Sequence, residues 1–124
     1  MIDHIGLRTT RFEDMTAFYA SVLKPLGYEK LMEFPDAAGF GKDGDPAFWL
    51  SLTDVTPTGI HLAMTAPTRA AVDEFFASAM AAGARDNGPP GLRDLYGPDY
   101  YAAFVYDLDG NNLEAVCQGG QYGS

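Results

Sequence analysis

The chain has 124 residues, of which 47% are hydrophobic and 20% are charged, so its composition is that of one folded domain and excludes a disordered segment. No apolar run approaches the roughly 18 residues that a membrane span needs, and we expect no signal peptide, because residues 1–4 carry neither a basic nor an apolar region. The net charge of −9 disfavours nucleic acid and anionic membrane surfaces as partners, since phosphate binding requires clustered Lys and Arg. The single cysteine, Cys117, cannot form an internal disulfide, and we expect a cytoplasmic protein.

The first half of the chain predicts one strand, one helix and three further strands. Alternating residues predict a strand over 1–8. The pattern Thr10-Arg11-Phe12-Glu13 is typical of a capping box, so we expect a helix to begin there and to end at Pro25 and Gly27. Three short strands are predicted over 28–34, 38–42 and 47–53, with Asp43-Gly44 as the turn between the last two.

The second half predicts the same order of elements. A strand is expected over 59–65, and Thr68 is the predicted N-cap of a helix that runs to about Ala82 and ends at Gly83. The Gly- and Pro-rich segment 87–98 predicts one short strand and a long loop, and the last strands are expected over 100–106 and 112–118. Each half therefore reads β-α-β-β-β, which indicates an α+β fold with two helices outside curved sheets.

The two halves also share an internal repeat. The offset that relates His4 to His61 also aligns Phe18-Tyr19-Ala20-Ser21 with Phe75-Phe76-Ala77-Ser78. We predict a single domain of two pseudo-symmetric units, 1–58 and 59–118, followed by a short tail over 119–124. The alternative is a chance similarity between two amphipathic helices.

The only two histidines, His4 and His61, occupy equivalent positions in the two units. Each is followed two positions later, on the same face of its predicted strand, by a small residue: Gly6 in one case and Ala63 in the other. Small neighbours leave room for a metal or a ligand, and a pseudo-two-fold relation would let the imidazoles converge. The alternative is that both are satisfied core histidines, or that His4 is exposed beside the N-terminus.

A third candidate metal ligand lies in the last predicted strand. Glu114 alternates there with Asn112 and Val116, and a carboxylate in so apolar a strand is costly unless it is paired or bound to a cation. Two imidazoles and one carboxylate form a donor set for Fe(II), Mn, Ni or Zn, with positions left for substrate oxygens. The alternative is a surface glutamate at a sheet edge.

The loop over 85–99 contains the arginine with the clearest candidate role. Arg93 is a candidate substrate-binding residue, because a guanidinium can clamp a carboxylate or phosphate in a bidentate manner. Loops of this length are often functional. The alternative is a lid in which Arg93 pairs with Asp94 or Asp99.

Aromatic residues supply the remaining candidates. Tyr101 and Tyr96 are candidate catalytic groups, because a phenol can donate a hydrogen bond to a developing oxyanion. Tyr100 and Trp49 are candidate substrate-binding residues that can stack on a ring, and ordinary core packing is the alternative for Trp49.

The motifs together resemble those of the vicinal oxygen chelate superfamily, over residues 1 to about 118. This is the group of glyoxalase I, extradiol ring-cleaving dioxygenases, fosfomycin-inactivating thiol transferases and bleomycin-binding resistance proteins. The segment 107–114, Asp-Leu-Asp-Gly-Asn-Asn-Leu-Glu, resembles the superfamily's D-P-D-G-N-x-x-E with leucine in place of proline. The other matching features are Asp3-His4-Ile5, Phe18-Tyr19, Gly27-Tyr28 and His61. Pro90–Arg93 and Tyr100–Val105 resemble stretches of a small glyoxalase-like subgroup.

The resemblance implies an open eight-stranded barrel made of two βαβββ units with two outer helices. It also implies a divalent metal (Fe, Mn, Ni or Zn) held by His4, His61 and Glu114, a small-molecule substrate chelated through adjacent oxygens, and a homodimer. The implied function is a metal-dependent lyase, ring-cleaving dioxygenase or thiol transferase. The alternative is a metal-free small-molecule binding protein of the bleomycin-resistance type.

One departure from the superfamily narrows these expectations. Glyoxalase I has a fourth ligand, a glutamate, on the last strand of its first unit, whereas residues 47–52 here contain no carboxylate. We therefore expect poor isomerisation of glutathione hemithioacetals. The two-histidine, one-carboxylate pattern of the dioxygenases and thiol transferases is unaffected.

Overall fold

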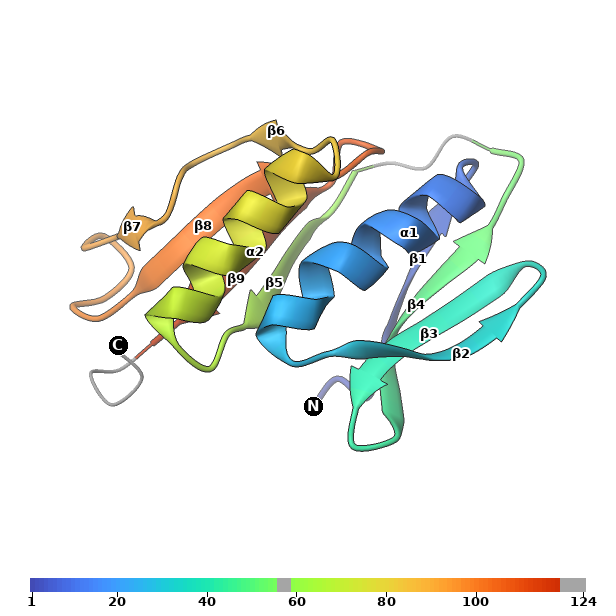
Figure 1. The fold of residues 1–124 in the computed structure, drawn as a ribbon, viewed down its shortest axis with the longest axis horizontal. Helices are drawn as coiled ribbons and strands as arrows, with labels where there is room; N and C mark the ends of the chain where they lie inside the picture. The colour runs from blue at the N-terminus through green and yellow to red at the C-terminus, as the bar shows by residue number, and fades with distance from the viewer. Residues whose placement is uncertain (56–58, 119–124) are drawn as a thin grey trace.

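The structure is a computed structural model that describes residues 1–55 and 59–118 (Figure 1). The elements of the first half are β1 (Ile5–Thr9), α1 (Phe12–Leu23), the 3-10 helix η1 (Lys24–Leu26), β2 (Glu29–Phe34), β3 (Ala37–Lys42) and β4 (Asp45–Leu52). Those of the second half are β5 (His61–Thr65), α2 (Arg69–Ala81), β6 (Arg85–Asp86), β7 (Gly91–Leu92), β8 (Tyr101–Tyr106) and β9 (Asn112–Cys117). The predicted end of the first unit at residue 58 and the predicted tail over 119–124 lie outside the described residues.

The strands form two separate sheets with matching topology. The first sheet has the order β1-β4-β3-β2, and the second has the order β5-β9-β8-β6, with β7 paired to β8. In each sheet the first strand of the unit pairs in parallel with the last, and the other pairs are antiparallel. The α+β class is confirmed, but the described strands of one chain do not close into an eight-stranded barrel. Instead β1 and β5 each lie at the edge of their own sheet.

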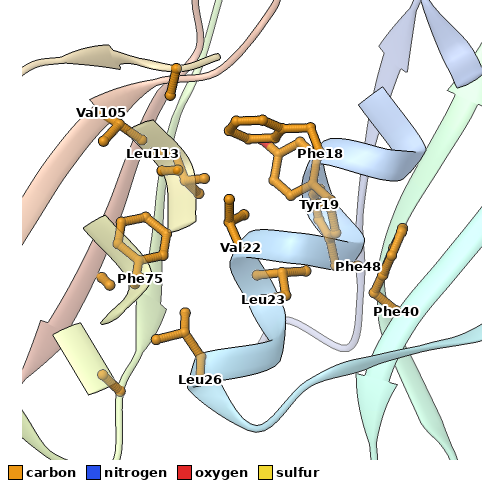
Figure 2. Packing of buried hydrophobic residues seen from close by; sticks show 14 of the residues in the cluster. Phe18, Tyr19, Val22, Leu23, Leu26, Phe40, Phe48, Phe75, Val105 and Leu113 are labelled. Atoms are coloured by element: carbon orange, nitrogen blue, oxygen red, sulfur yellow. The ribbon is translucent and has the colours of Figure 1, made fainter. Parts of the chain in front are cut away.

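The two helices join the units through one hydrophobic core. Figure 1 shows α1 and α2 side by side, on the same side of both sheets. In Figure 2, α1 residues such as Val22 lie between the second-unit side chains Phe75 and Leu113 and the first-unit side chains Phe40 and Phe48. Burial of α1 on both sides explains its wide apolar stripe, whose core members are Met15, Phe18, Tyr19, Val22 and Leu23.

The two helices begin differently. Thr68 is the N-cap of α2, as predicted, and its Oγ1 accepts a hydrogen bond of 3.0 Å from the Ala71 amide. The predicted capping box at Thr10 is wrong, because the N-cap of α1 is Arg11 and no side chain caps this helix. The buried hydroxyl of Thr9 accepts the hydrogen bond from the Arg11 amide at 2.9 Å, so Thr10 is left exposed.

Most of the other predicted boundaries agree with the structure within about three residues, as is usual for element ends. The turn at Asp43-Gly44 is confirmed, with φ of 55° and 76°, and positive φ at both central residues is the geometry of a two-residue hairpin turn. Within the part of the chain that the structure describes, no helix has the length and apolar character needed to cross a membrane.

Candidate functional site

The turn between β8 and β9 positions the two strands that carry the candidate site. Both backbone amides of Asp109 and Asn111 donate to Asp107 Oδ1 at 2.9 Å, and the Asn111 side-chain amide donates to Asp107 Oδ2 at 2.8 Å. Asn111 Oδ1 in turn accepts a hydrogen bond of 3.0 Å from the amide of Ile60, the residue before His61. The turn therefore holds the start of β9 and the start of β5 in one arrangement.

That arrangement brings together two of the predicted metal ligands. The parallel register pairs Ala63 with Glu114, and His61 Nε2 lies 2.8 Å from Glu114 Oε1. Glu114 is only 2% exposed, because β9 is an inner strand between β5 and β8. The alternative of a surface glutamate at a sheet edge is therefore excluded, and this buried carboxylate is satisfied by polar partners.

Tyr100 is the second partner of the buried carboxylate. Its hydroxyl donates a hydrogen bond to Glu114 Oε2, so each carboxylate oxygen accepts from a different side chain. Burial, reinforced by the hydrogen bond to Glu114, raises the pKa of Tyr100 to about 12. The phenol therefore stays a donor at neutral pH. The ring of Tyr96 packs edge-on against Tyr100, with centroids 5.3 Å apart.

The third predicted metal ligand is placed elsewhere in the chain. His4 Nδ1 lies 2.7 Å from Asp3 Oδ1, and both side chains are largely exposed. Figure 1 shows β1 and β5 running in opposite directions and beginning at opposite ends, and His4 directly precedes β1 whereas His61 begins β5. Residues 1–55 and 59–118 accordingly contain no group of three His, Cys, Asp or Glu side chains that could hold a metal ion.

The structure separates the neighbouring residues Tyr100 and Tyr101. The Tyr101 hydroxyl donates to Asp73 Oδ1 of α2 at 2.6 Å, and the Arg69 guanidinium lies 5.2 Å from the Tyr101 ring centroid. Consecutive residues entering a strand point to opposite faces, so only one of the two can reach Glu114. Tyr101, predicted as catalytic, is thus on the helix side of the sheet, and Tyr100 has the position beside the carboxylate.

The other predicted substrate-binding residues, Trp49 and Arg93, lie in different units of the chain. Trp49 is in β4, half-buried, and its Nε1 donates to the Pro46 carbonyl at 3.0 Å. Arg93 instead lines a cavity of about 520 Å³ beside β8 and β9, together with Tyr96. The alternative pairing of Arg93 with Asp94 or Asp99 is not formed, since Arg93 donates to the carbonyls of Gly91 and Pro89 and the nearest basic partner of Asp99 is Arg69, at 4.0 Å.

Two contacts of the site were not predicted, that of Tyr100 with Glu114 and that of Tyr19 with Asp107. Strand alternation over 100–106 places Tyr100 on the face of Phe104, but only the register of the structure, in which Phe104 pairs with Glu114, puts that face beside the carboxylate. The hydrogen bond of 2.6 Å from the Tyr19 hydroxyl to Asp107 Oδ2 joins α1 to the turn before β9. Sequence spacing gave no signal for this contact, which depends on how the two units pack.

Comparison with known proteins places the chain in a family. The family model described as Glyoxalase/Bleomycin resistance protein/Dioxygenase superfamily matches residues 1–115, and the chain therefore belongs to this superfamily. No curated protein matches the sequence.

Solved structures share the fold over nearly the whole chain. A glyoxalase/bleomycin resistance protein from Albidiferax ferrireducens T118 is 24% identical with a TM-score of 0.76, and the match covers 94% of this chain and 97% of that one. A glyoxalase/bleomycin resistance protein/dioxygenase family enzyme from Burkholderia phytofirmans PsJN is 20% identical with a TM-score of 0.73, covering 95% and 98%. A glyoxalase-related enzyme from Fulvimarina pelagi is 19% identical with a TM-score of 0.73, covering 100% and 95%. At these identities the similarity establishes the fold alone.

Proposed function

We propose that this protein is a metal-dependent enzyme that acts on a small molecule bound through adjacent oxygens, as a ring-cleaving dioxygenase, lyase or thiol transferase. The observation that carries the proposal is the contact between His61 and the buried carboxylate of Glu114. Members of the superfamily bind small-molecule substrates and typically use divalent metals.

The two side chains fit a divalent cation. Two donor atoms that are each about 2.1 Å from an ion and meet it at about a right angle lie about 3 Å apart, and His61 Nε2 and Glu114 Oε1 are 2.8 Å apart. An imidazole nitrogen with a carboxylate oxygen suits Fe, Mn, Ni or Zn. Tyr100 would orient the carboxylate from its other oxygen, as outer partners of metal ligands do. When bound, the cation would supply Lewis-acid activation of a substrate oxygen.

We propose that the third ligand, His4, comes from a second copy of the chain. Both β1 and β5 are edge strands, and unpaired edges are usually covered by another segment. In the proposed homodimer, β1 of one copy lies beside β5 of the other, so the first sheet of one copy and the second sheet of its partner form an open barrel. His4 is largely exposed and free to enter such an interface.

The residues of this site favour some reactions over others. The position in the first unit that corresponds to Glu114 is occupied by Trp49, as the registers Gly6 with Trp49 and Ala63 with Glu114 show. Glu33 of β2 is exposed, and its Oε1 is 2.9 Å from Lys30 Nζ, so it is not placed to act as a base at this site. With no carboxylate base opposite Glu114, we propose poor turnover of glutathione hemithioacetals and better turnover in ring cleavage or addition.

The experiment is a complementation test between two defective variants, His4→Ala and His61→Ala. Each variant alone should lose metal binding by calorimetry with Fe(II), Mn(II), Ni(II) or Zn(II). Mixing the two, after mild denaturation and refolding together, should restore one metal site per mixed dimer, because one site then combines an intact His4 with an intact His61 and Glu114. Wild-type protein should bind about one metal per chain.

Glu33→Gln serves as the control for a removed carboxylate and should leave metal binding unchanged. If the mixture of the two variants does not bind metal, or if light scattering finds a monomer at micromolar concentration, the proposal of a metal site shared between two copies is contradicted. Efficient hemithioacetal turnover that His61→Ala abolishes would contradict the proposed reaction preference.

A second candidate is a metal-free binding protein of the bleomycin-resistance type. It is favoured by the lack of a third metal ligand near Glu114 among the described residues of one chain, and by the cavity that Tyr96 and Phe104 line. Tight binding of a bulky aromatic compound without metal uptake by the wild-type protein would select this candidate.

A further inference from the structure

The cavity of about 520 Å³ adjoins the proposed metal site. It lies between the segment 87–96 and the strands β8 and β9, on the face that carries Glu114. Phe104, in its wall, is the register partner of Glu114, and the ring centroids of Phe104 and His61 are 6.3 Å apart. Tyr96, at its rim, contacts Tyr100. A ligand in the cavity would therefore extend toward His61 and Glu114.

Arg93 lies in the wall of this cavity, and its guanidinium is held by uncharged groups. Arg93 Nη1 donates to the Gly91 carbonyl at 2.9 Å, and Nη2 donates to the Pro89 carbonyl at 2.7 Å. The guanidinium carbon lies 5.4 Å from the centroid of the Phe104 ring. A Cβ added at Gly88 or Gly91 would come within 3.2 Å of an Arg93 nitrogen, so the loop is shaped around the guanidinium.

Arg93 differs from the ion-paired arginines of the chain. Arg11 lies near Asp14 at 3.4 Å and Arg69 near Asp99 at 4.0 Å, whereas no carboxylate of residues 1–55 or 59–118 lies within ion-pair distance of Arg93. Asp94 lines the same cavity but does not come within ion-pair distance, so among the described residues the charge of Arg93 has no counterion, although the chain carries a net charge of −9. A guanidinium has five N–H donors, and acceptors among the described residues take two of these. Such a fork binds a carboxylate or a phosphate with two parallel hydrogen bonds.

We infer that Arg93 is the anchor for an oxyanion of the ligand, a carboxylate or a phosphate, whose apolar body lies against Phe104 and Leu92. The cavity volume is in the range of small-molecule sites and admits a ring with a short charged arm. Fixing the arginine before binding lowers the entropy lost when the anion is captured. Only the further step, in which the other end of the ligand reaches His61 and Glu114, rests on the proposed function.

The test uses metal-free protein in chelator, with benzoate and phenyl phosphate as anionic probes and benzamide as the neutral control. In ¹⁵N NMR titrations the anions should shift the amides of Gly88 and Gly91 and the Arg93 Nε–H signal, and benzamide should bind at least tenfold more weakly. Arg93→Gln should weaken anion binding at least tenfold. Arg85→Gln is the matched control and should change it less than twofold, because Arg85 of β6 packs on Tyr106 of β8 and does not line the cavity. The two anions distinguish a carboxylate ligand from a phosphate ligand by their relative affinity.

A second pair of variants keeps the test decisive if Arg93→Gln rearranges the loop. Leu92 is 50% exposed at the cavity wall, so Leu92→Glu adds a negative charge there without removing a side-chain hydrogen bond. It should weaken anion binding several-fold relative to Leu92→Gln. Benzamide binding as tight as benzoate, or no loss in Leu92→Glu, would overturn the inference. Because the titration contains no metal, its failure leaves the proposed metal site untouched, and failure of the metal complementation leaves anion binding untouched.

Discussion

The two units have the same topology but carry different chemistry at equivalent positions. In the second sheet, Glu114 of β9 lies between Ala63 and Phe104, whereas in the first sheet Trp49 of β4 lies between Gly6 and Gly39. A carboxylate beside an aromatic ring in one unit is thus replaced by an indole beside two glycines in the other.

The difference shows that the two units share a topology but not the side chains of the candidate site. In each unit, three paired residues on neighbouring strands include one large aromatic side chain. In the second unit this side chain is Phe104 on β8, and in the first unit it is Trp49 on β4, which is the strand equivalent to β9. This shift leaves space for the carboxylate only in the second unit. The same fold therefore supports a polar pair in one half and an apolar surface in the other, which agrees with the rule that function depends on the site and not on the fold.

The largest expected effect tests the chemical asymmetry directly. Glu114→Gln should weaken metal binding at least about 100-fold, or about 2.8 kcal/mol, since the carboxylate is the charged member of the proposed ligand set. Trp49→Phe, at the equivalent position of the first unit, should change the metal affinity less than about twofold. Calorimetric titration of both variants makes the comparison, and equal losses would show that the first unit contributes to the metal site through Trp49.

The packing around Trp49 gives the next effect. A Cβ at Gly39 would lie 2.9 Å from the Trp49 ring, whereas a Cβ at Gly6, on the other side of Trp49, has nothing within 4 Å. Gly39→Ala should therefore lower the free energy of unfolding by about 1–3 kcal/mol, and Gly6→Ala should leave it unchanged or raise it by about 0.4–1 kcal/mol. Urea denaturation of the two variants checks this, and equal stabilities would mean that Trp49 is free to move.

The contact between the units has a pH-dependent effect. Tyr19→Phe gives the first unit the residue that the repeat has at Phe76, and it removes the hydrogen bond of 2.6 Å to Asp107. The expected loss is about 1.5 kcal/mol at neutral pH, because the acceptor is a buried carboxylate.

Burial first, then the nearby charge of Asp107, raises the pKa of Tyr19 well above 10.0, its ordinary value. A raised pKa in the folded state gives stability that is complete below the unfolded value near 10.0 and is lost as the pH rises further. The stability difference between wild type and Tyr19→Phe should thus be constant from about pH 6 to 9 and shrink above pH 10. A difference that stays constant through pH 11 in denaturation curves would contradict this account.

The smallest expected effect compares the two helix starts. Thr68→Ala should cost about 1 kcal/mol, since it removes the N-cap of α2. Thr10→Ala should change the free energy of unfolding by less than about 0.5 kcal/mol, because its exposed side chain caps nothing. Thermal or urea unfolding measures both. A similar loss of unfolding free energy in Thr10→Ala would indicate that Thr10 caps α1 after all.

The fold was predictable to the extent that it depends on local patterns. Periodicity and turn residues predicted both helices and the turn at Asp43-Gly44. The start of α1 was mispredicted because the helix begins one residue later than the capping-box pattern indicates, with Arg11 and not Thr10 at the N-cap. The division of the strands into two sheets was not predictable, because the residue patterns of β1 and β5 do not indicate whether these two strands pair with each other or lie at the edges of separate sheets.

The part of the candidate site that depends on local sequence pattern was also predictable. Glu114 stood out because a carboxylate in an apolar strand needs a partner, and the structure gives it His61 and Tyr100. The choice between Tyr100 and Tyr101 depends on the register of β8 against β9, which composition and spacing do not fix. The place of His4 relative to this pair depends on how the units are arranged, and it remains a prediction about the assembled protein.

The parallel pairing of β1 with β4 and of β5 with β9 has a consequence for the order of events during synthesis. The first sheet lacks β4, the inner strand that joins β1 to β3, until Leu52 has left the ribosome, and by then all of α1 has been exposed. The face of α1 that packs on Phe75 and Leu113 must remain uncovered until the second unit is made, so the nascent chain presents an apolar helix surface for most of its translation. The second unit thus covers this face of α1 late in synthesis, and we expect ribosome-bound chains truncated near residue 60 to be recognised by chaperones more strongly than chains that extend past β9.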